Sequence, residues 1–439
     1  LFVRQVWTSR ETSLGQAMAS STSTRPRTDG ARFDVRHFFV PARHDRLHVP
    51  SEPHICAIIP TYAPGKLTLR LVKDLIRWNP KIIVYVVDDC TSHSNKKSVA
   101  LFENIAAVST RVVVLRTPVN TLKAGALNFA LKDIFENRST INVILTLDDD
   151  VVINFSTVNN LVTELISHPA LGAVCSQCRV FNKNTNILTR LQGLEYLGFN
   201  AIRLADEGFF RGPLVMHGML TAFKAEALQE VGGFAEWHLI EDYEITTRLK
   251  ARGWSVKSAQ NAPAWTLVPE RISKLWRQRT RWSYGGITVV AQATSPLSVF
   301  QDLVGHTLFL STMLLVGVLF FSQGGGLVSP SIAQWIIALS LFQLAMWYAF
   351  QIWQMRLYQE KDFYDWILRI TLFPEFIYSY MMTFALLGSY VFHSFNALKR
   401  TIMKEKGSNS WRFFTVGSRF FRACGYTEGS WGTRVRETP

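Results

Sequence analysis

Asn142-Val143-Ile144-Leu145-Thr146-Leu147-Asp148-Asp149-Asp150 is an apolar, β-branched run that ends in three consecutive carboxylates. A short run of this kind is typical of a buried strand. Adjacent carboxylates repel one another unless a cation neutralises them, and Mg²⁺ and Mn²⁺ prefer oxygen ligands. The run therefore predicts a strand whose carboxyl end holds Mg²⁺ or Mn²⁺, with Asp150 as the main ligand and Asp148 beside it. A solvated acidic turn or a helix cap is the alternative.

Short β-branched runs alternate with helical stretches from Ile55 onward, as in a parallel sheet with crossover helices. A second acidic pair, Asp88-Asp89, also follows a predicted strand. Carboxylates at the carboxyl ends of such strands lie in the crevice where open α/β sheets bind ligands. We therefore expect residues 51–268 to form an α/β nucleotide-binding domain. Its predicted strands are 55–60, 82–87, 112–115 and 142–147, and its predicted helices are 67–78 and 124–135.

The composition favours a membrane protein over a nucleic-acid-binding one. The chain has 439 residues, with 47 Lys and Arg against 33 Asp and Glu, and its apolar residues concentrate after residue 300. The Lys and Arg residues are scattered through the first half of the chain and are more frequent beside the apolar runs. Such an excess is typical of segments that flank membrane spans on the cytoplasmic side. The five cysteines predict no disulfide framework. Cys175 and Cys178 lack a second ligand pair, so they do not indicate a zinc site.

Two apolar runs, Leu303–Phe321 and Ile332–Trp353, are each long enough to cross a bilayer. A third, Trp366–Phe395, is interrupted at Pro374 and is either a kinked span or a re-entrant piece followed by a span. The sequence thus predicts a multi-pass protein of the cell membrane with a cytoplasmic catalytic domain. The predicted regions are a flexible tail at 1–50, interfacial amphipathic helices at 269–300, transmembrane helices at 301–395 and a basic tail at 396–439.

Two helix starts carry groups suited to transfer from a nucleotide diphosphate. Lys123 opens a helix among small residues, where a diphosphate can approach the backbone. Glu241-Asp242 opens another helix, and a carboxylate there is commonly a cap. Transfer of a sugar from a nucleotide diphosphate with inversion needs a base that takes the proton of the acceptor hydroxyl. It also needs positive charge that neutralises the departing diphosphate. We predict Asp242 as the base with Glu241 beside it.

Gln278-Arg279-Thr280-Arg281-Trp282 precedes the first apolar run. On a helix, Gln278, Arg281 and Trp282 share one face. That face offers an amide, a guanidinium that pairs with phosphate oxygens and an indole on which a sugar ring stacks. An amphipathic surface helix at the membrane is the alternative.

Taken together, these motifs resemble the processive inverting family-two glycosyltransferases, among them cellulose, chitin, hyaluronan and bacterial poly-N-acetylglucosamine synthases. The motifs are, in order, Asp89, Lys123, Asp148 to Asp150, Gln192-Gly193-Leu194-Glu195-Tyr196, Glu241-Asp242 and Gln278 to Trp282. The resemblance implies a GT-A fold (a mixed, mostly parallel, Rossmann-like sheet), a UDP-sugar donor, a divalent metal, and a growing polysaccharide acceptor extruded across the lipid bilayer. By resemblance, Asp89 and Asp148 hold uridine, Asp150 the metal, Asp242 the acceptor hydroxyl, and Gln278, Arg281 and Trp282 the acceptor and diphosphate. Thr61 and Arg279 are further substrate-binding candidates.

The tail and the departures from the family pattern refine this expectation. Ser430-Trp431-Gly432-Thr433-Arg434 resembles the close of hyaluronan and chitin-oligomer synthases, where Trp431 and Arg434 would gate the nucleotide. This favours an N-acetylglucosamine-containing polymer, hyaluronan- or chitin-like, over the alternative of a non-processive transfer to lipid or protein. Three simple spans would leave this tail on the side opposite the catalytic domain, so either the third run doubles back or a further crossing lies elsewhere. Leu122 stands where the family often has Gly. No predicted membrane helix precedes the catalytic domain, so the channel is either complete in this chain or finished by a lost segment, a second copy or a partner subunit.

Overall fold

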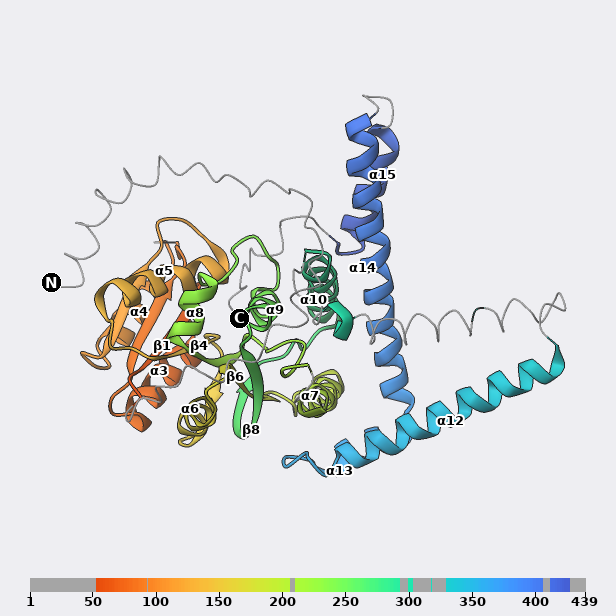
Figure 1. Ribbon diagram of the computed structural model, residues 1–439, viewed down its shortest axis with the longest axis horizontal. Coiled ribbons are helices and arrows are strands. Elements are labelled where there is room, and N and C mark those ends of the chain that lie inside the picture. The colour runs from red at the N-terminus through yellow and green to blue at the C-terminus, as the bar shows by residue number, and fades with distance from the viewer. Residues whose placement is uncertain are drawn as a thin grey trace.

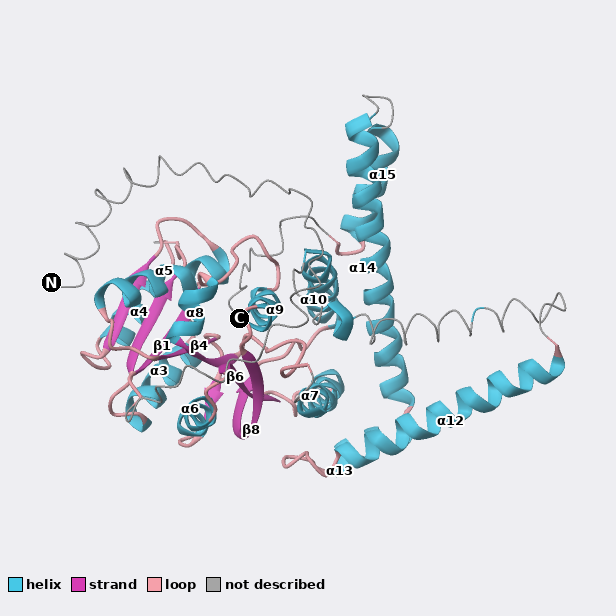
Figure 2. Ribbon diagram, viewed as in Figure 1, coloured by secondary structure: helices cyan, strands magenta, loops and turns pink. Residues whose placement is uncertain are grey.

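The computed structural model describes residues 53–92, 94–205, 210–292, 299–302, 317, 329–405 and 411–426. Its centre is one eight-stranded sheet in the order β3-β2-β1-β4-β7-β6-β8-β5 (Figures 1 and 2). β1, β2, β3 and β4 pair in parallel, β7 is antiparallel to both β4 and β6, β8 is parallel to β6, and β5 is antiparallel to β8. This mixed, mostly parallel sheet confirms the predicted α/β class.

The strands are β1 Ile55–Thr61, β2 Ile83–Asp88, β3 Val112–Arg116, β4 Val143–Leu147, β5 Val152–Ile153, β6 Leu171–Val180, β7 Leu220–Lys224 and β8 Ser255–Thr266. The helices of the sheet domain are α3 Lys66–Trp78, α4 Lys96–Ala106, α5 Leu122–Asn137, α6 Thr157–Ser167, α7 Ile187–Ala205, α8 Ala225–Val231 and α9 Glu241–Ala251. They are followed by α10 Ile272–Gln292, α12 Pro330–Gln354, α13 Phe363–Thr371, α14 Phe373–Glu405 and α15 Trp411–Ala423.

Helices cover both faces of the sheet. One hydrophobic cluster joins α3, α4 and α6 to one face through residues such as Leu71, Phe102 and Leu161. The other joins α5, α8 and α9 to the opposite face through Leu127, Leu228 and other apolar residues. Since alternate residues of a strand point to opposite faces, a strand buried on both sides is mostly apolar, and β4 is buried throughout with Thr146 as its single polar residue.

The predicted strands and helices of the first half are present, with ends shifted by a few residues. Helix α4 was missed, because its sequence, Lys96-Lys97-Ser98-Val99-Ala100-Leu101-Phe102-Glu103-Asn104-Ile105-Ala106, follows a serine-rich loop and has only a weak apolar stripe. The strand β5 was missed as well, since two residues are too short for a periodic pattern to show.

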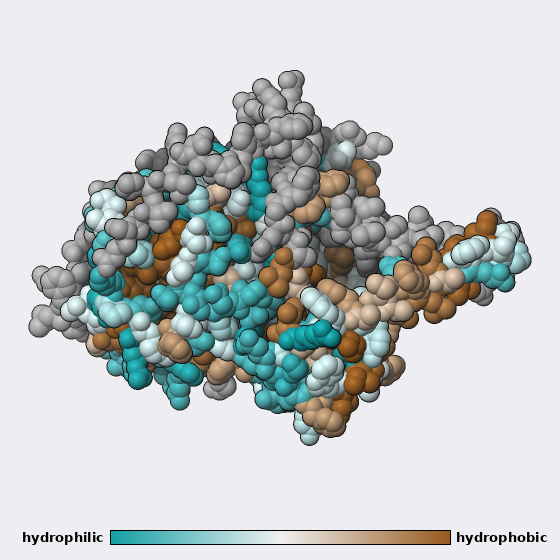
Figure 3. Space-filling view, turned by 60° about the horizontal axis from the view of Figure 1, so that its bottom comes forward, coloured by the Kyte–Doolittle hydropathy of each residue, from teal (hydrophilic) through white to brown (hydrophobic). Residues whose placement is uncertain are grey.

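The predicted multi-helix membrane region is not confirmed. Within the described residues, α12 is the one continuous helix long and apolar enough to cross a bilayer, and most of its side chains are exposed (Figure 3). The third apolar run is broken between α13 and α14, whose axes are bent by 71°, and counting that pair as one span gives two at most. The predicted span Leu303–Phe321 lies outside the described residues, apart from Gly317. The same holds for the predicted tail at 1–50.

Part of the region that was predicted as a basic tail, 396–439, is helical. Helix α14 continues to Glu405, and α15 covers Trp411–Ala423. No Pro or Gly interrupts residues 396–405, and Ala, Leu, Lys and Arg there are good helix formers. The end of α15 lies against α10, since Trp276 Nε1 donates to the Cys424 carbonyl at 2.8 Å and Tyr426 packs among Trp276 and Phe392. Trp431 and Arg434 lie outside the described residues.

Candidate active site

The three aspartates after β4 point to different partners. Asp148 Oδ1 lies 2.7 Å from the ammonium nitrogen of Lys123. Asp149 is buried, and its Oδ2 accepts a hydrogen bond from Thr61 Oγ1 at 2.6 Å. Asp150 Oδ1 accepts from Thr266 Oγ1 at 3.2 Å, at the end of β8. The stretch therefore joins β1, α5 and β8 at one edge of the sheet.

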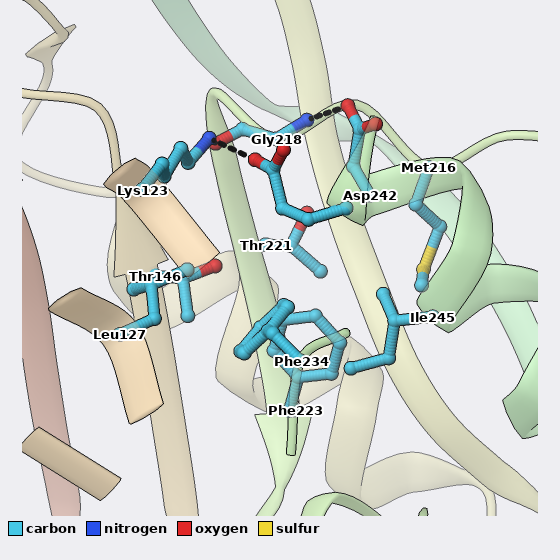
Figure 4. Close-up of a pocket in the computed structure, with 11 residues that line it drawn as sticks. Lys123, Leu127, Thr146, Met216, Gly218, Thr221, Phe223, Phe234, Asp242 and Ile245 are labelled. Carbon is cyan, nitrogen blue, oxygen red and sulfur yellow. Dashed lines mark hydrogen bonds and ion pairs between the residues drawn. The ribbon is translucent and has the colours of Figure 1, made fainter. Parts of the chain in front are cut away.

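The Lys123 ammonium is the centre of the site (Figure 4). Besides Asp148 it contacts Glu241 Oε1 at 3.0 Å and donates to the Gly218 carbonyl at 2.8 Å. Burial alone would lower the pKa of this lysine, but the carboxylates of Asp148 and Glu241 outweigh burial and raise it. Lys123 is therefore a fixed positive charge among acidic groups.

Asp242 lies next to this cluster and is held by the backbone. Its Oδ2 accepts from the Gly218 N–H at 2.7 Å, and its Oδ1 accepts from the Tyr243 N–H at 2.8 Å (Figure 4). Burial, and then the charge of Glu241, raise the pKa of Asp242 to about 6, although Lys123 and the two backbone N–H groups act in the opposite direction. A carboxyl with this pKa is ionised near neutral pH and can still accept a proton, as a general base must.

Gly218 bridges the base and the lysine through one residue. A Cβ at this position would lie 2.5 Å from Lys123 Nζ and 3.2 Å from Asp242 Oδ2, so only glycine fits without displacing them. The preceding residue, His217, is buried, and its Nε2 lies 2.6 Å from the Ser176 carbonyl. Sequence patterns gave no hint of Gly218, because its role comes from side chains distant in sequence.

Two predicted substrate-binding residues hold the framework of the site. Thr61 binds Asp149, as described above. Asp89 is buried, and its Oδ1 accepts hydrogen bonds from Thr117 Oγ1, Thr121 Oγ1 and the Thr121 N–H. Asp89 thereby fixes the loop that leads into α5 and Lys123.

The segment Gln278 to Trp282 lies on α10, as predicted, but Arg279 points inward. It is buried and forms an ion pair with Glu195 of α7, while Tyr378 of α14 donates to the same carboxylate at 2.7 Å. Its guanidinium lies over the Trp282 ring, 4.1 Å from the centroid, and donates to Gln278 Oε1 at 2.8 Å. Trp282 packs against the hydrophobic cluster that contains Met219, the residue after Gly218.

Arg279 therefore supports Gln278 and Trp282 rather than facing an open surface. Arg281 is half-buried on the same helix. Glu195 belongs to the motif Gln192 to Tyr196, but its pairing with Arg279 could not be predicted from spacing, because the two are brought together only by the packing of α7 on α10.

A model of the family described as glycosyl transferase family group 2 matches residues 143–352. The match covers a little under half of the chain and agrees with the resemblance of its motifs to family-two glycosyltransferases.

The chain is also similar to named relatives over part of their length. A poly-β-1,6-N-acetyl-D-glucosamine synthase of Staphylococcus epidermidis is 31% identical over 172 residues, which are 39% of this chain and 40% of the relative. A synthase of the same name from Staphylococcus aureus is 30% identical over 171 residues, again 39% and 40% of the two chains. The chain thus spans about 40% of the length of these curated relatives.

A solved structure supports the fold. The mannosyltransferase of Pyrobaculum calidifontis in complex with GDP-Man and Mn²⁺ aligns with a TM-score of 0.51 and 19% identity, over 76% of this chain and 92% of that chain. This likeness shows a GT-A-like fold and leaves the donor nucleotide open.

Proposed function

We propose that this chain is a membrane-integrated, processive, inverting glycosyltransferase that polymerises sugar from a UDP-sugar and extrudes the polymer across the cell membrane. The observation that carries the proposal is the arrangement of Lys123, Glu241 and Asp242 around Gly218 at the carboxyl edge of the sheet. It combines a general base with a fixed positive charge, which transfer from a nucleotide diphosphate requires. The similarity to poly-N-acetylglucosamine synthases supports an N-acetylglucosamine-containing product.

In the proposed reaction, the acceptor hydroxyl hydrogen-bonds to Asp242 and loses its proton to that carboxylate as its oxygen bonds to the anomeric carbon. The bond between that carbon and the diphosphate oxygen breaks on the opposite side, and the diphosphate leaves with its electron pair. Backbone N–H groups of Gly218 and Tyr243 hold the Asp242 carboxylate in one orientation. Orienting the base in advance lowers the barrier, because little entropy is lost at the moment of reaction.

The donor set suits Mg²⁺ or Mn²⁺, with Asp150 and Asp148 as the protein ligands. Among the described residues no group of three or more His, Cys, Asp or Glu gathers in a metal-binding arrangement. That fits an ion which binds through one or two carboxylates and takes its other ligands from substrate phosphates and water. When bound, such an ion would neutralise charge on the diphosphate. The complex of the mannosyltransferase with Mn²⁺ supports this proposal.

The acceptor is proposed to lie against Trp282, with Gln278 and Arg281 beside it. The buried Arg279 guanidinium lies over the Trp282 ring and binds the Gln278 amide oxygen, which holds both side chains in place. Asp89 and Asp148 are proposed to form the uridine side of the site, and Trp431 and Arg434 to close over the nucleotide. A membrane arrangement with more than one crossing is supported by α12 and by the bent pair of α13 and α14. The catalytic domain is proposed to face the cytoplasm, as the basic residues beside the apolar runs favour.

Membranes that contain the enzyme test the proposal. Incubation with UDP-N-acetylglucosamine, alone and paired with UDP-glucuronic acid, and with Mg²⁺ or Mn²⁺ should release UDP and yield a polymer that linkage-specific hydrolases degrade. Asp242→Asn should abolish both. Products that carry a single added sugar would instead establish the alternative, a non-processive transfer to a lipid or protein. UDP release that persists after Asp242→Asn would exclude Asp242 as the base.

A further inference from the structure

A second cavity, of about 550 Å³, lies apart from the Lys123 cluster, at the β5 edge of the sheet. This volume is within the range of roughly 300–1,000 Å³ that is typical of small-molecule sites. Its walls come from β5, from the end of β6 and the loop after it, from β8, and from the segment between α12 and α13. The lining residues are Val152, Ile153, Asn154, Val180, Phe181, Lys183, Asn184, Trp265 and Glu360.

Strand pairing places Trp265 in this cavity and its neighbour in the active site. Trp265 is paired with Val152 on one side and with Arg179 on the other, so these three side chains share a face of the sheet. The hydroxyl of Thr266, the next residue along β8, binds Asp150. The cavity therefore lies beside the proposed metal ligand, and Val180, the strand partner of Thr266, also lines it.

Glu360 joins the outer wall of the cavity to the sheet. It accepts a hydrogen bond from Trp265 Nε1 at 2.8 Å and pairs with Arg179 at 2.9 Å. Lys183 is buried, with its ammonium 2.8 Å from Asp365 and bonded to the Glu360 carbonyl. The positive charges of Arg179 and Lys183 are thus already paired with the carboxylates of Glu360 and Asp365. The cavity therefore offers little attraction to a phosphate or a nucleotide.

The remaining lining groups suit a neutral ligand that has both apolar faces and hydroxyls. The Phe181 side chain is 44% exposed, and the Trp265 indole is a second flat surface. Asn184 is exposed and contributes an amide, and Asn154 contributes its Nδ2 group, because its Oδ1 already accepts hydrogen bonds from Ser156 and Thr157. Flat rings with a few placed polar groups match a sugar, whose ring face is apolar and whose edge is hydroxylated.

We propose that this cavity binds a short neutral oligosaccharide, of the kind that the active site extends. The inference rests on the proposed function for the identity of the saccharide, but not for the existence of the site. An oligosaccharide held here would keep a product or primer chain at the enzyme between successive transfers.

Saturation-transfer NMR on the purified full chain in lipid nanodiscs tests the inference, with β-1,6-linked tetra-N-acetylglucosamine as the probe. We expect binding that UDP does not displace, that persists in Asp242→Asn, and that weakens about tenfold in Phe181→Ala. Phe155→Ala is the matched control, because Phe155 is 74% exposed and does not line the cavity. Asn184→Ala, at an exposed position, is a second variant that spares the fold.

Unchanged affinity in both Phe181→Ala and Asn184→Ala, with melting temperatures equal to that of the wild type, would overturn the inference. Loss of the signal on adding UDP would also overturn it, since the probe would then occupy the active site. If the wild type makes no polymer but binds the probe, and Phe181→Ala weakens that binding, the proposed polymerisation is contradicted and the proposed saccharide site is supported. If polymer forms but Phe181→Ala binds the probe as the wild type does, the saccharide site is contradicted and polymerisation is supported.

Discussion

Lys123 Nζ lies 3.0 Å from Glu241 Oε1, which joins the first turn of α5 to the first turn of α9. The amino end of a helix favours an anion and disfavours a cation, so α9 stabilises Glu241 while α5 opposes Lys123. The contacts with Glu241 and Asp148 offset that opposition. Lys123 is thus kept charged by the acids around it, and it in turn lowers the pKa of Asp242.

Replacing Lys123 should therefore change the pH dependence as well as the rate. In Lys123→Gln we expect kcat/KM to fall by about 10²- to 10³-fold, as when one charge-stabilising group is removed. Because Lys123 lowers the pKa of Asp242, its loss should also raise that pKa and move the acid limb of the pH profile to higher pH. Initial rates of UDP release between pH 5 and 9 measure both effects.

The matched control is Lys132→Gln on the same helix, because the Lys132 side chain is 67% exposed and its nearest acid, Glu136, is 4.0 Å away. It should leave the rate and the profile unchanged. An acid limb at the same pH in Lys123→Gln and in the wild type would show that Lys123 does not act on the base.

Gly218→Ala should inactivate the enzyme without unfolding it. Its Cβ would lie 2.5 Å from Lys123 Nζ, and the flexible lysine can move away, at the cost of its contacts with Asp148 and Glu241. A displacement of about 1 Å at a catalytic site costs roughly 10²-fold in rate. Gly65→Ala is the control, since nothing lies within 4 Å of its added Cβ. Equal kcat in Gly218→Ala and in the wild type would contradict this account of the site.

The acidic ends of β2 and β4 could be predicted because the apolar runs before them are continuous and the carboxylates follow directly. The charge pattern also marked Lys123 and Asp242 as candidates. The roles of Thr61, Asp89 and Arg279 as supports for other side chains could not be predicted, because each depends on a partner brought close only by tertiary packing. The break between α13 and α14 could be predicted from Pro374, but the sequence did not decide between a kinked span and a re-entrant piece.

Asp242 should be a site where function costs stability. Its pKa is about 6 in the folded protein, against 3.8 as the ordinary value. Between pH 4 and 6 the folded state therefore binds more protons than the unfolded state, and stability falls as the pH rises through this window. Asn cannot ionise, but its Nδ2 group cannot accept a hydrogen bond, so one of the two backbone N–H groups that bind the carboxylate loses its acceptor. Asp242→Asn should thus be inactive, and its stability relative to the wild type should rise by up to roughly 3 kcal/mol as the pH increases from 4 to above 6.

Thermal melting in detergent at pH 4.5 and pH 7.5 checks this expectation. The melting temperature of Asp242→Asn relative to the wild type should be higher at pH 7.5 than at pH 4.5. A difference that is equal at both values, or a loss confined to pH 7.5, would mean that the ionised carboxylate is not destabilising in the folded protein.

Leu122 has a φ of 61°, in the left-handed region that favours glycine. This is the position where the family often has Gly, and a non-glycine residue there costs on the order of 1–3 kcal/mol. The Leu122 side chain is 41% exposed, so little packing is lost on removing it. Leu122→Gly should therefore be at least as stable as the wild type, even though glycine gains chain entropy on unfolding. Leu122→Ala keeps the Cβ and should show no gain, so a higher melting temperature for Ala than for Gly would contradict the assignment of strain.

Variants of the buried ion pair between Arg279 and Glu195 distinguish its contribution to the stability of the fold from its role in positioning Trp282 and Gln278. In Glu195→Gln the guanidinium stays buried without its carboxylate, which should cost about 3–5 kcal/mol. Replacing both residues, by Arg279→Met together with Glu195→Leu, should restore most of the melting temperature, because no buried charge is left uncompensated. Activity should stay low in the double variant, since Trp282 and Gln278 lose the group that holds them. Recovery of both stability and the KM for acceptor would show that Arg279 has no part in positioning the indole.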